Sequence, residues 1–365
     1  MAERGATPKV SPLRRGFLGA IRHLFNPLHP DDYLELINPL WTTRELRGRV
    51  VEVRPEGADA ATVWIQPGYE WPGHQPGQYV RLGVVIDGVF HWRAYSLTSD
   101  PHPRDGLISV TPKLVEEGKV SPYLVRGIRP GEIVRLGEIE GVFTLPDPLP
   151  EKMLFISAGS GITPIMSMLR DLDHRDRVDD VVAIHSAHSD EQVMFKSDLE
   201  SMDERHDGFD LTLRITGRDG RIKATDLDEL CPDWRERQAM CSGPRELLDS
   251  LVEHFESEGV GDRIHLERFQ PIIGGNAGEG EGGTVRFTRS DTEVTCEPGQ
   301  PILVAGEENG LELKFGCRIG ICHTCTGVLK QGSIRDLRTG EVSSPEGSSI
   351  RICVNTAEGD VDVDL

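Results

Sequence analysis

Short hydrophobic runs bounded by Pro and Gly fill the chain between about residues 46 and 148. Their length and spacing are typical of the strands of an antiparallel barrel, in which tight turns connect neighbouring strands. We therefore predict a β-barrel here. The six runs that we expect to be strands are 48–55, 61–67, 78–86, 89–97, 107–114 and 132–139.

The pattern changes after residue 151. An apolar run at 152–158 precedes a stretch with helical periodicity at 164–175, and a second apolar run follows at 180–187. Farther along, the run 238–244 leads into another helical stretch, 245–259. Alternation of buried strands and helices predicts a parallel α/β sheet. Beyond it, residues 284–310 have the pattern of a hairpin followed by a short helix, as in a small α+β domain.

Two breaks divide these regions. Prolines interrupt the pattern at 145–150, and the segment 274–283 contains six glycines, which favour a flexible linker. We therefore expect a multidomain protein. Its parts are an N-terminal extension (1–45), the β-barrel (46–148), the α/β domain (149–273), the linker (274–284) and the C-terminal α+β domain (285–365).

The composition limits the classes of function that the protein can have. The 365 residues are 37% hydrophobic and carry a formal net charge of −20, so we expect a folded protein that does not bind nucleic acid, which requires a basic surface. The N-terminus shows no secretory signal, and the longest uncharged run is broken by Gly and Pro. We expect a cytoplasmic protein in a reducing compartment, where a disulfide framework is rare.

Residues 14–25 differ from the rest of the N-terminal extension. The apolar residues Phe17, Leu18, Ile21, Leu24 and Phe25 fall roughly on one helical face, and three arginines accompany them. One interpretation is a helix packed on the protein body. The other is a weak peripheral anchor at the inner face of the cell membrane.

Four cysteines have the spacing of a metal site. Cys317, Cys322 and Cys325 form a C-x4-C-x2-C pattern, and Cys353 follows after 27 residues. This is the ligand spacing of a plant-type 2Fe–2S cluster, whereas a zinc ribbon normally has two C-x2-C pairs. We predict that these four thiolates bind a 2Fe–2S cluster. The other cysteines, Cys231, Cys241 and Cys296, are expected to be buried and unligated.

Short motifs in the first two domains resemble those of the ferredoxin–NADP reductase superfamily. They are "RAYS" (93–96), "AGSGITP" (158–164) and "CSGP" (241–244), with "PGQYV" (76–80) and "ERF" (267–269) also at the expected places. The resemblance implies that the barrel binds FAD, that the α/β domain binds NAD(P), and that the tail is a β-grasp ferredoxin domain.

The resemblance also implies a set of site residues. Glycines in the dinucleotide loop let the pyrophosphate approach the backbone at a helix N-terminus. The residue before Gly-Pro in the later motif is Ser242, where many relatives have Cys. The implied flavin residues are Arg93, Ala94, Tyr95, Ser96, Gly118, Lys119, Val120 and Ser121; the implied nucleotide residues are Gly159, Ser160, Gly161, Ile162, Thr163, Pro164, Ser242, Gly243 and Pro244; the implied catalytic residues are Ser96, Ser242, Glu267 and Phe269.

Cofactor preference depends on the residues after the second strand of the α/β domain, because hydroxyl and cationic donors there select the 2′-phosphate. Ser186 and His188 occupy this region, and relatives often have Arg at the position of His188. Arg214, Arg218 and Arg221 follow later in the chain. We expect NADPH to be preferred over NADH.

The parts imply an electron relay from NADPH through FAD and the 2Fe–2S cluster to a separate polypeptide. The stretches 29–50 and 91–101 and the ferredoxin tail further resemble actinobacterial NADPH oxidoreductases that serve an integral-membrane stearoyl-CoA Δ9-desaturase. A soluble ring-hydroxylating, steroid or alkane oxygenase is the alternative acceptor. An electron-transfer subunit that does not oxidise NAD(P)H is a different class, and the presence of both nucleotide motifs argues against it.

Overall fold

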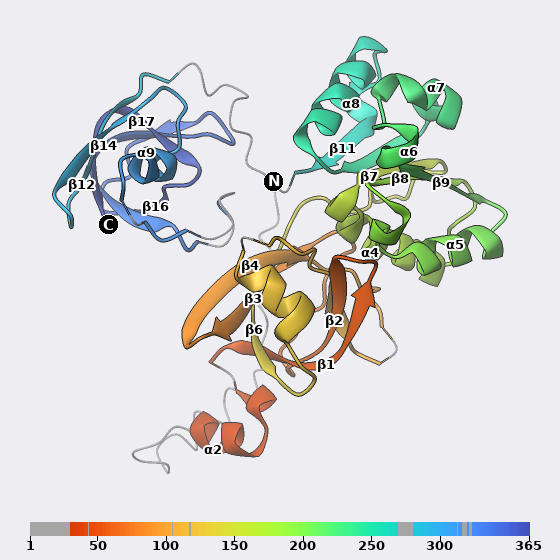
Figure 1. The fold of residues 1–365 in the computed structure, drawn as a ribbon, viewed down its shortest axis with the longest axis horizontal. Helices are drawn as coiled ribbons and strands as arrows, with labels where there is room; N and C mark the ends of the chain where they lie inside the picture. The colour runs from red at the N-terminus through yellow and green to blue at the C-terminus, as the bar shows by residue number, and fades with distance from the viewer. Residues whose placement is uncertain are drawn as a thin grey trace. The chain divides into compact units, whose positions relative to one another are not determined.

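The computed structural model describes residues 30–42, 44–103, 105–116, 118–268, 280–311, 313–315, 320 and 323–365. The chain divides into two compact units, and their main boundary lies between Glu267 and Arg268. Figure 1 shows the β-barrel and the α/β sheet of the first unit and the smaller sheet of the second.

The first part of the first unit is an antiparallel sheet in the order β4-β3-β6-β1-β2-β5. Leu97, directly after β4, pairs with Val110 of β5, so the two ends of this order meet and the sheet closes into a barrel. The predicted β-barrel is confirmed. The strands are β1 (Leu46–Glu56), β2 (Ala60–Pro67), β3 (Tyr79–Ile86), β4 (Val89–Ser96), β5 (Ile108–Val110) and β6 (Ile133–Glu140).

One strand is shorter than its hydrophobic pattern indicates. The run 107–114 forms only the three residues of β5. Pro112 follows two residues later and has no N–H to donate to a ladder. The chain then turns into a helical segment made of α3 (Val120–Pro122) and the π-helix η2 (Tyr123–Gly127).

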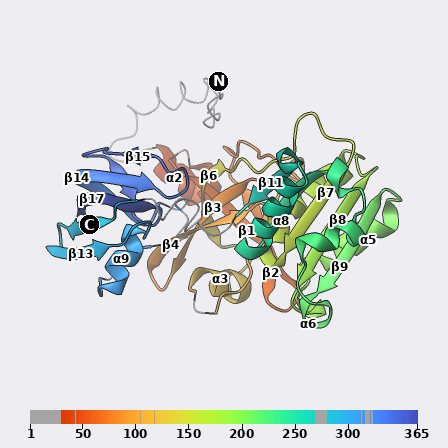
Figure 2. The same cartoon turned by 90° about the horizontal axis from the view of Figure 1, so that it is seen from above.

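The second part of the unit is a five-stranded sheet in the order β11-β10-β7-β8-β9, in which every pairing is parallel. Figure 2 shows β7, β8 and β9 side by side. The predicted parallel α/β sheet is confirmed. The strands are β7 (Met153–Ala158), β8 (Val181–Ala187), β9 (Phe209–Ile215), β10 (Gln238–Ser242) and β11 (Ile264–Glu267).

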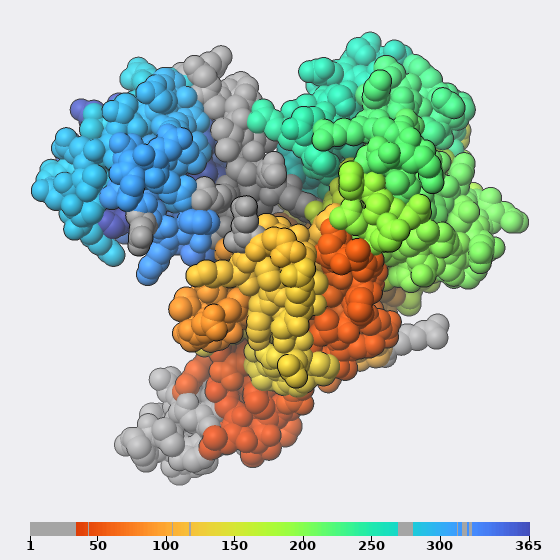
Figure 3. Space-filling view, in the orientation of Figure 1, coloured from red at the N-terminus to blue at the C-terminus, as the bar shows by residue number. Residues whose placement is uncertain are grey.

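Helices cover both faces of this sheet. Residues of α4 and α5 belong to the apolar cluster on one face, and residues of α8 belong to the cluster on the other. In Figure 3 the barrel and the α/β part form one continuous surface. The helices and turns are η3 (Gly159–Gly161), α4 (Ile162–His174), η4 (Asp190–Gln192), α5 (Lys196–Arg205), α6 (Thr216–Asp219), η5 (Ala224–Asp226), α7 (Leu227–Leu230), η6 (Trp234–Glu236), α8 (Arg245–Ser257) and η7 (Gly261–Arg263).

The second unit is a mixed sheet packed on one helix. Its first two strands form the predicted hairpin, the predicted helix follows, and β12 pairs in parallel with the last strand, β17. This is the expected α+β fold of the ferredoxin type. The elements are β12 (Gly283–Phe287), β13 (Thr292–Cys296), α9 (Ile302–Glu308), β14 (Thr326–Asp336), β15 (Val342–Ser343), β16 (Ser349–Arg351) and β17 (Asn355–Asp364).

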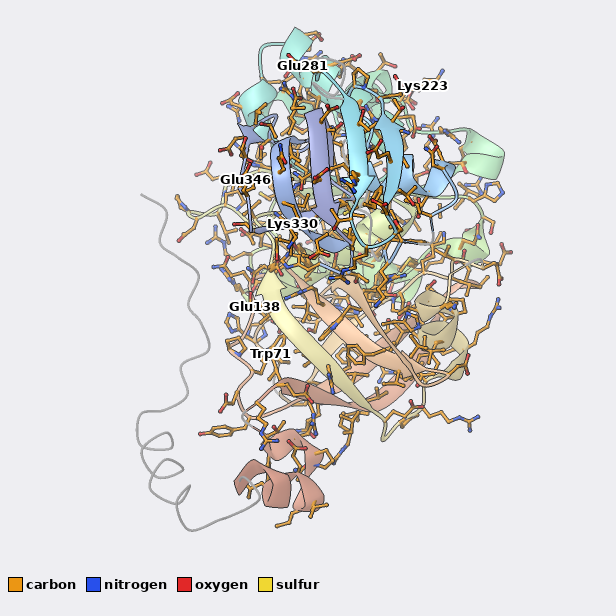
Figure 4. All side chains as sticks on the ribbon, turned by 90° about the vertical axis from the view of Figure 1, so that its left-hand side faces the viewer. Trp71, Glu138, Lys223, Glu281, Lys330 and Glu346 are labelled. Atoms are coloured by element: carbon orange, nitrogen blue, oxygen red, sulfur yellow. The ribbon has the colours of Figure 1, made fainter. Side chains whose placement is uncertain are left out.

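Charged side chains line the outer face of this second sheet. Lys330 extends from β14, and its Nζ lies 3.1 Å from Oδ2 of Asp364 at the end of β17 (Figure 4). The ion pair is half exposed, so it contributes little to stability. The sheet is held instead by the buried apolar side chains that it packs against α9.

The N-terminal extension packs on the barrel through ion pairs and hydrogen bonds. It contains α2 (Pro30–Ile37) and the turn η1 (Pro39–Trp41). Arg47 of β1 lies 3.2 Å from Glu35, and Arg49 donates to Asn38. The segment 14–25, and the predicted linker as far as residue 279, lie outside the described residues.

Among the described helices, none has the length and apolar character that a membrane span requires.

Candidate cofactor sites

The strand order of the parallel sheet reverses at β7. From this first strand the chain moves outward to β8 and β9 on one side and then to β10 and β11 on the other. Such a reversal leaves a crevice at the carboxyl ends of the two central strands, where α/β folds bind nucleotides. The loop "GSGITP" follows β7 and the sequence "SGP" ends β10, so both predicted nucleotide motifs lie at this point.

The two motifs pack backbone to backbone. A Cβ on Gly161 would lie 2.1 Å from the carbonyl oxygen of Ser242 and 2.8 Å from the nitrogen of Gly243. Gly159 has a positive φ of 55°, and a Cβ there would meet nothing within 4 Å. One glycine is therefore required for close packing, and the other leaves open space beside the loop. This arrangement fits the close approach of a pyrophosphate to the backbone.

Ser242 and Glu267 lie side by side at the ends of β10 and β11. Ser242 is fully buried, and its hydroxyl has no hydrogen-bond partner among the described residues. Burial raises the pKa of Glu267 to about 7. A buried polar atom without a partner is costly, so these groups fit a ligand that supplies hydrogen bonds. Phe269, which the resemblance implies to be the aromatic residue that shields the flavin face, lies outside the described residues.

The strand that carries "RAYS" is poorly covered by protein. None of the side chains from Val89 to Tyr95 is fully buried, whereas Ser96 at the end of β4 is. Arg93 donates from Nη1 to the Trp92 carbonyl at 2.8 Å, and Tyr95 packs at the edge of the barrel core. Partly exposed aromatic and cationic side chains on a barrel strand fit a planar, negatively charged cofactor such as FAD.

The second predicted flavin segment forms a tight turn before α3. The Gly118 N–H donates to the Val115 carbonyl, and the Val115 N–H donates to Oγ of Ser121 at 3.1 Å. Val120 and Ser121 are buried, and Lys119 is exposed. The turn is therefore fixed by its own hydrogen bonds and leaves the Lys119 ammonium available to solvent or to a phosphate.

Contacts that the sequence did not indicate join helix α4, which follows the nucleotide loop, to the barrel residues that follow the flavin motif. Helix α4 begins at the nucleotide loop, and three of its side chains contact the residues that follow "RAYS". Ser167 donates to the Ser99 carbonyl at 2.8 Å, Arg170 to the Thr98 carbonyl at 2.5 Å, and His174 Nδ1 lies 2.8 Å from Asp100. The signal in the sequence was a polar stripe with i, i+3, i+7 spacing on a predicted helix.

The residues predicted to select the 2′-phosphate differ in exposure. His188 is exposed, and its Nδ1 lies 3.4 Å from the Thr216 hydroxyl after β9. Ser186 is buried within β8. Among the three arginines, Arg214 bonds to carbonyls of its own turn, whereas Arg218 is exposed and lies 2.8 Å from Asp219. His188, Thr216 and Arg218 thus form a group at the ends of β8 and β9, in which His188 and Arg218 are exposed and Thr216 is half-buried.

Two of the four predicted cluster ligands are described. Cys325 and Cys353 are buried, and the N–H of Ile352, next to Cys353, donates to the Cys325 carbonyl. Gly320, between the other two cysteines, has a φ of 78°, and a Cβ there would lie 2.8 Å from the Val354 side chain. A glycine with positive φ near two buried thiols fits a 2Fe–2S cluster. Cys317 and Cys322 lie outside the described residues, and Cys231, Cys241 and Cys296 are buried as predicted.

Comparison with known families identifies three domains in the chain. The family described as "Oxidoreductase FAD-binding domain" matches residues 70–143. The family described as "Oxidoreductase NAD-binding domain" matches residues 155–253. The family described as "2Fe-2S iron-sulfur cluster binding domain" matches residues 285–356. The chain therefore uses FAD, a pyridine nucleotide and a 2Fe–2S cluster.

Known proteins are similar to this chain along most of its length. A protein of Mycobacterium tuberculosis named NADPH oxidoreductase is 46% identical over 342 residues, which cover 93% of this chain and 89% of that protein. The glycine betaine monooxygenase reductase subunit of Pseudomonas aeruginosa is 28% identical, covering 80% of this chain and 87% of its own. The structure of phthalate dioxygenase reductase matches with a TM-score of 0.59 at 21% identity and covers 88% of this chain and 98% of its own, which shows the shared fold.

Proposed function

Since the chain belongs to the family of ferredoxin–NADP reductase-type flavoproteins with a C-terminal 2Fe–2S ferredoxin domain, we propose that it transfers electrons from NADPH to a separate membrane acyl-CoA Δ9-desaturase. The proposal rests on the finding that the chain is an NAD(P)H-dependent flavin and iron–sulfur oxidoreductase. The preference for NADPH and the identity of the acceptor are what we add.

The bound groups supply the redox chemistry, because FAD accepts electrons in pairs from the nucleotide and the cluster passes them on singly. The chain supplies binding and orientation. In our proposal, Arg93, Tyr95 and Ser96, with the Gly118–Ser121 turn, hold FAD. Cys317, Cys322, Cys325 and Cys353 ligate the cluster.

The remaining predicted residues act on the nucleotide. The loop from Gly159 to Pro164 and the Ser242–Pro244 segment hold the dinucleotide backbone. Ser242 and Glu267 then lie beside the nicotinamide, and Phe269 shields the face of the flavin ring. The close packing of Gly161 against Ser242 supports this assignment, since it brings the two nucleotide motifs into one site.

The group at the ends of β8 and β9 supports NADPH. Arg218 has a side chain that is 65% exposed and can form charge-assisted hydrogen bonds, and His188 and Thr216 add donors beside it. We expect a higher kcat/KM for NADPH than for NADH with ferricyanide as the acceptor. Arg218→Ala should lower the value for NADPH and leave that for NADH unchanged. A wild-type preference for NADH would overturn this part of the proposal.

The N-terminal extension supports a partner in the membrane. Leu36 and Ile37, at the end of α2, are 85% and 72% exposed, so the extension presents apolar surface to its surroundings. The basic and apolar segment 14–25 precedes them in the chain. A single short amphipathic segment gives only weak and reversible membrane attachment. Such contact would keep the reductase near an integral-membrane desaturase without anchoring it.

The test is a reconstituted reaction. NADPH and the purified protein should support desaturation of stearoyl-CoA by membranes that contain the desaturase. Deletion of residues 1–28 should lower this rate more than it lowers ferricyanide reduction, since ferricyanide needs no membrane. Replacing both Leu36 and Ile37 by Ser should act in the same direction. Replacing exposed Val142, which lies on the barrel outside the extension, by Ser is the matched control.

Two outcomes would change the assignment. Failure with the desaturase but efficient support of a soluble oxygenase would favour the role that is named for the glycine betaine monooxygenase reductase subunit. Failure to oxidise NAD(P)H with any acceptor would indicate a non-enzymatic electron-transfer subunit.

A further inference from the structure

Four polar side chains form a row across the parallel sheet. Cross-strand pairing places Glu267 beside Ser242, Ser242 beside Ser157, and Ser157 beside His185. Residues paired in register on neighbouring strands project to the same face of a sheet. The row therefore runs from β11 through β10 and β7 to β8, at the carboxyl ends of the strands.

On β7 and β8, the strand positions two and four residues before the row belong to a hydrophobic cluster that also includes Ala60 and Phe143 of the barrel, and Met240 of β10 belongs to it as well. Toward the edge of the sheet the same face carries Gln238 and His265, which lie within hydrogen-bond distance of each other. Ser157 and His185 are each only 2% exposed. Burial of polar groups in such a core costs free energy unless they form hydrogen bonds. A row of buried polar side chains is therefore expected to have a function. The apolar strand positions are Met153, Phe155, Val181, Ala183 and Met240.

Ser157 and His185 bind each other. Oγ of Ser157 lies 2.8 Å from Nδ1 of His185. Burial, together with the nearby Lys113 ammonium, lowers the pKa of His185 to about 4, so the imidazole is neutral at physiological pH. A neutral imidazole that is hydrogen-bonded at Nδ1 restricts the rotation of the serine hydroxyl. The orientation of Ser157 is therefore set by His185.

The neighbouring hydroxyl lacks such a partner. Ser242 is 0% exposed, and its Oγ forms no hydrogen bond with any residue that the structure describes. Nε2 of His185 also forms no hydrogen bond with a residue that the structure describes. The row thus combines one oriented hydroxyl with one unsatisfied hydroxyl, next to the loops that would hold the dinucleotide. A group with both a donor and an acceptor, such as a carboxamide, would satisfy them.

We propose that Ser157 and His185 are positioning residues that orient the nicotinamide of the bound nucleotide through its carboxamide. The proposal rests on the oxidation of NAD(P)H by this chain, and it adds two residues to that site. His185 acts through Ser157 and needs no contact with the nucleotide. The phosphates and the adenosine bind elsewhere along the loops, so loss of the pair should change the placement of the ring more than the affinity for the whole nucleotide.

The experiment compares two pairs of variants of the full-length flavoprotein. Ser157→Ala removes the hydroxyl and Ser157→Thr keeps it. His185→Leu removes the partner of Ser157, and His185→Asn keeps a polar group near the position of Nδ1. We expect Ser157→Ala and His185→Leu to lower kcat with ferricyanide about tenfold and to change KM for NADPH less than threefold. Ser157→Thr and His185→Asn should recover most of the loss.

Two readouts separate positioning from a structural role. The change in the visible flavin spectrum on titration with NADP⁺ should lose amplitude in Ser157→Ala while Kd is nearly constant. The kinetic isotope effect with NADPH deuterated at C4 should increase, because hydride transfer becomes more limiting. An unchanged amplitude and isotope effect in folded Ser157→Ala would overturn the proposal, whether or not His185→Leu folds. Inactivity of the unmodified protein would instead refute the proposed function.

Discussion

Gly161 lies so close to Ser242 that a Cβ on the glycine would be 2.1 Å from the serine carbonyl oxygen. Both partners at this contact are backbone, so neither can rotate away. Gly161→Ala should therefore separate the two nucleotide loops, with a strain of about 1–3 kcal/mol. We expect Kd for NADP⁺ to rise about tenfold or more while bound flavin is retained, since each 1.4 kcal/mol is a factor of ten.

The control for this variant is Gly261→Ala. A Cβ on Gly261 would first meet the flexible side chain of Glu256, at 3.1 Å. This change should leave nucleotide affinity unaltered. Equal loss in both variants would mean that general destabilisation, rather than the contact of the loops, explains the effect.

Glu267 should make the stability of the first unit depend on pH. Burial raises the pKa of its carboxyl group to about 7, above the value of about 4.3 in an unfolded chain. The folded state therefore binds the proton more tightly. The resulting stabilisation is complete below the unfolded pKa and is lost as pH rises through about 7.

Urea unfolding between pH 5 and pH 8 tests this dependence. The wild type should lose stability relative to Glu267→Gln as pH rises, because the amide does not ionise. Glu204→Gln, at an exposed position, is the control and should run parallel to the wild type. Parallel curves for Glu267→Gln would contradict the inferred environment of this carboxyl group.

Arg93 should contribute to flavin retention. A charge-assisted contact with a phosphate is worth about 1.5–3 kcal/mol, so Arg93→Ala should lose flavin during extensive dialysis, measured by absorbance per chain. Arg54→Ala is the matched control, since Arg54 lies on the surface of β1, where it pairs with Glu52 and lies over the Trp64 ring. Unchanged flavin affinity in Arg93→Ala would remove the proposed contact.

The cluster ligands can be separated from the other buried cysteines. Cys322→Ser and Cys353→Ser should abolish the iron signal and leave NADPH–ferricyanide activity largely intact, because that reaction requires only the flavin. Cys296→Ser is the control: Cys296 is buried in the same unit, where its Sγ lies 3.1 Å from the Gln300 carbonyl oxygen. Full iron content in either ligand variant would refute the assignment.

Arg237 should be a major stabilising residue of the α/β domain. Its guanidinium, 8% exposed, donates to both carboxylate oxygens of Asp233 at 2.7 and 3.0 Å and lies 2.7 Å from Asp180. Arg237→Met should lower the free energy of unfolding by about 2–3 kcal/mol, since the buried Met153 carbonyl and the partly exposed carboxylates of Asp233 and Asp180 lose a charged donor. Arg237→Lys should lose less. Urea unfolding measures both, and iron content should not change.

Local patterns in the sequence were sufficient to predict much of the fold and the classes of cofactor. The four-cysteine spacing, the glycines of the dinucleotide loop and the change from short strands to strand–helix alternation each depend on residues close together in the chain. Strand β9 was missed, because "FDLTLRI" alternates polar and apolar residues, whereas a buried parallel strand is usually apolar throughout. Its position at the edge of the sheet explains the alternation.

The sequence by itself determined the cofactor classes, the order of the domains, most strands of the first unit and the helices α4, α8 and α9, since these follow from short motifs and hydrophobic periodicity. Only the tertiary structure decided which distant residues meet. The contact of Gly161 with Ser242, the docking of Ser167 on Ser99 and the row from Glu267 to His185 all depend on strand order and register. Each pairs residues far apart in the chain, and no local pattern encodes such pairs, because a shift of one residue in register would turn every side chain to the opposite face.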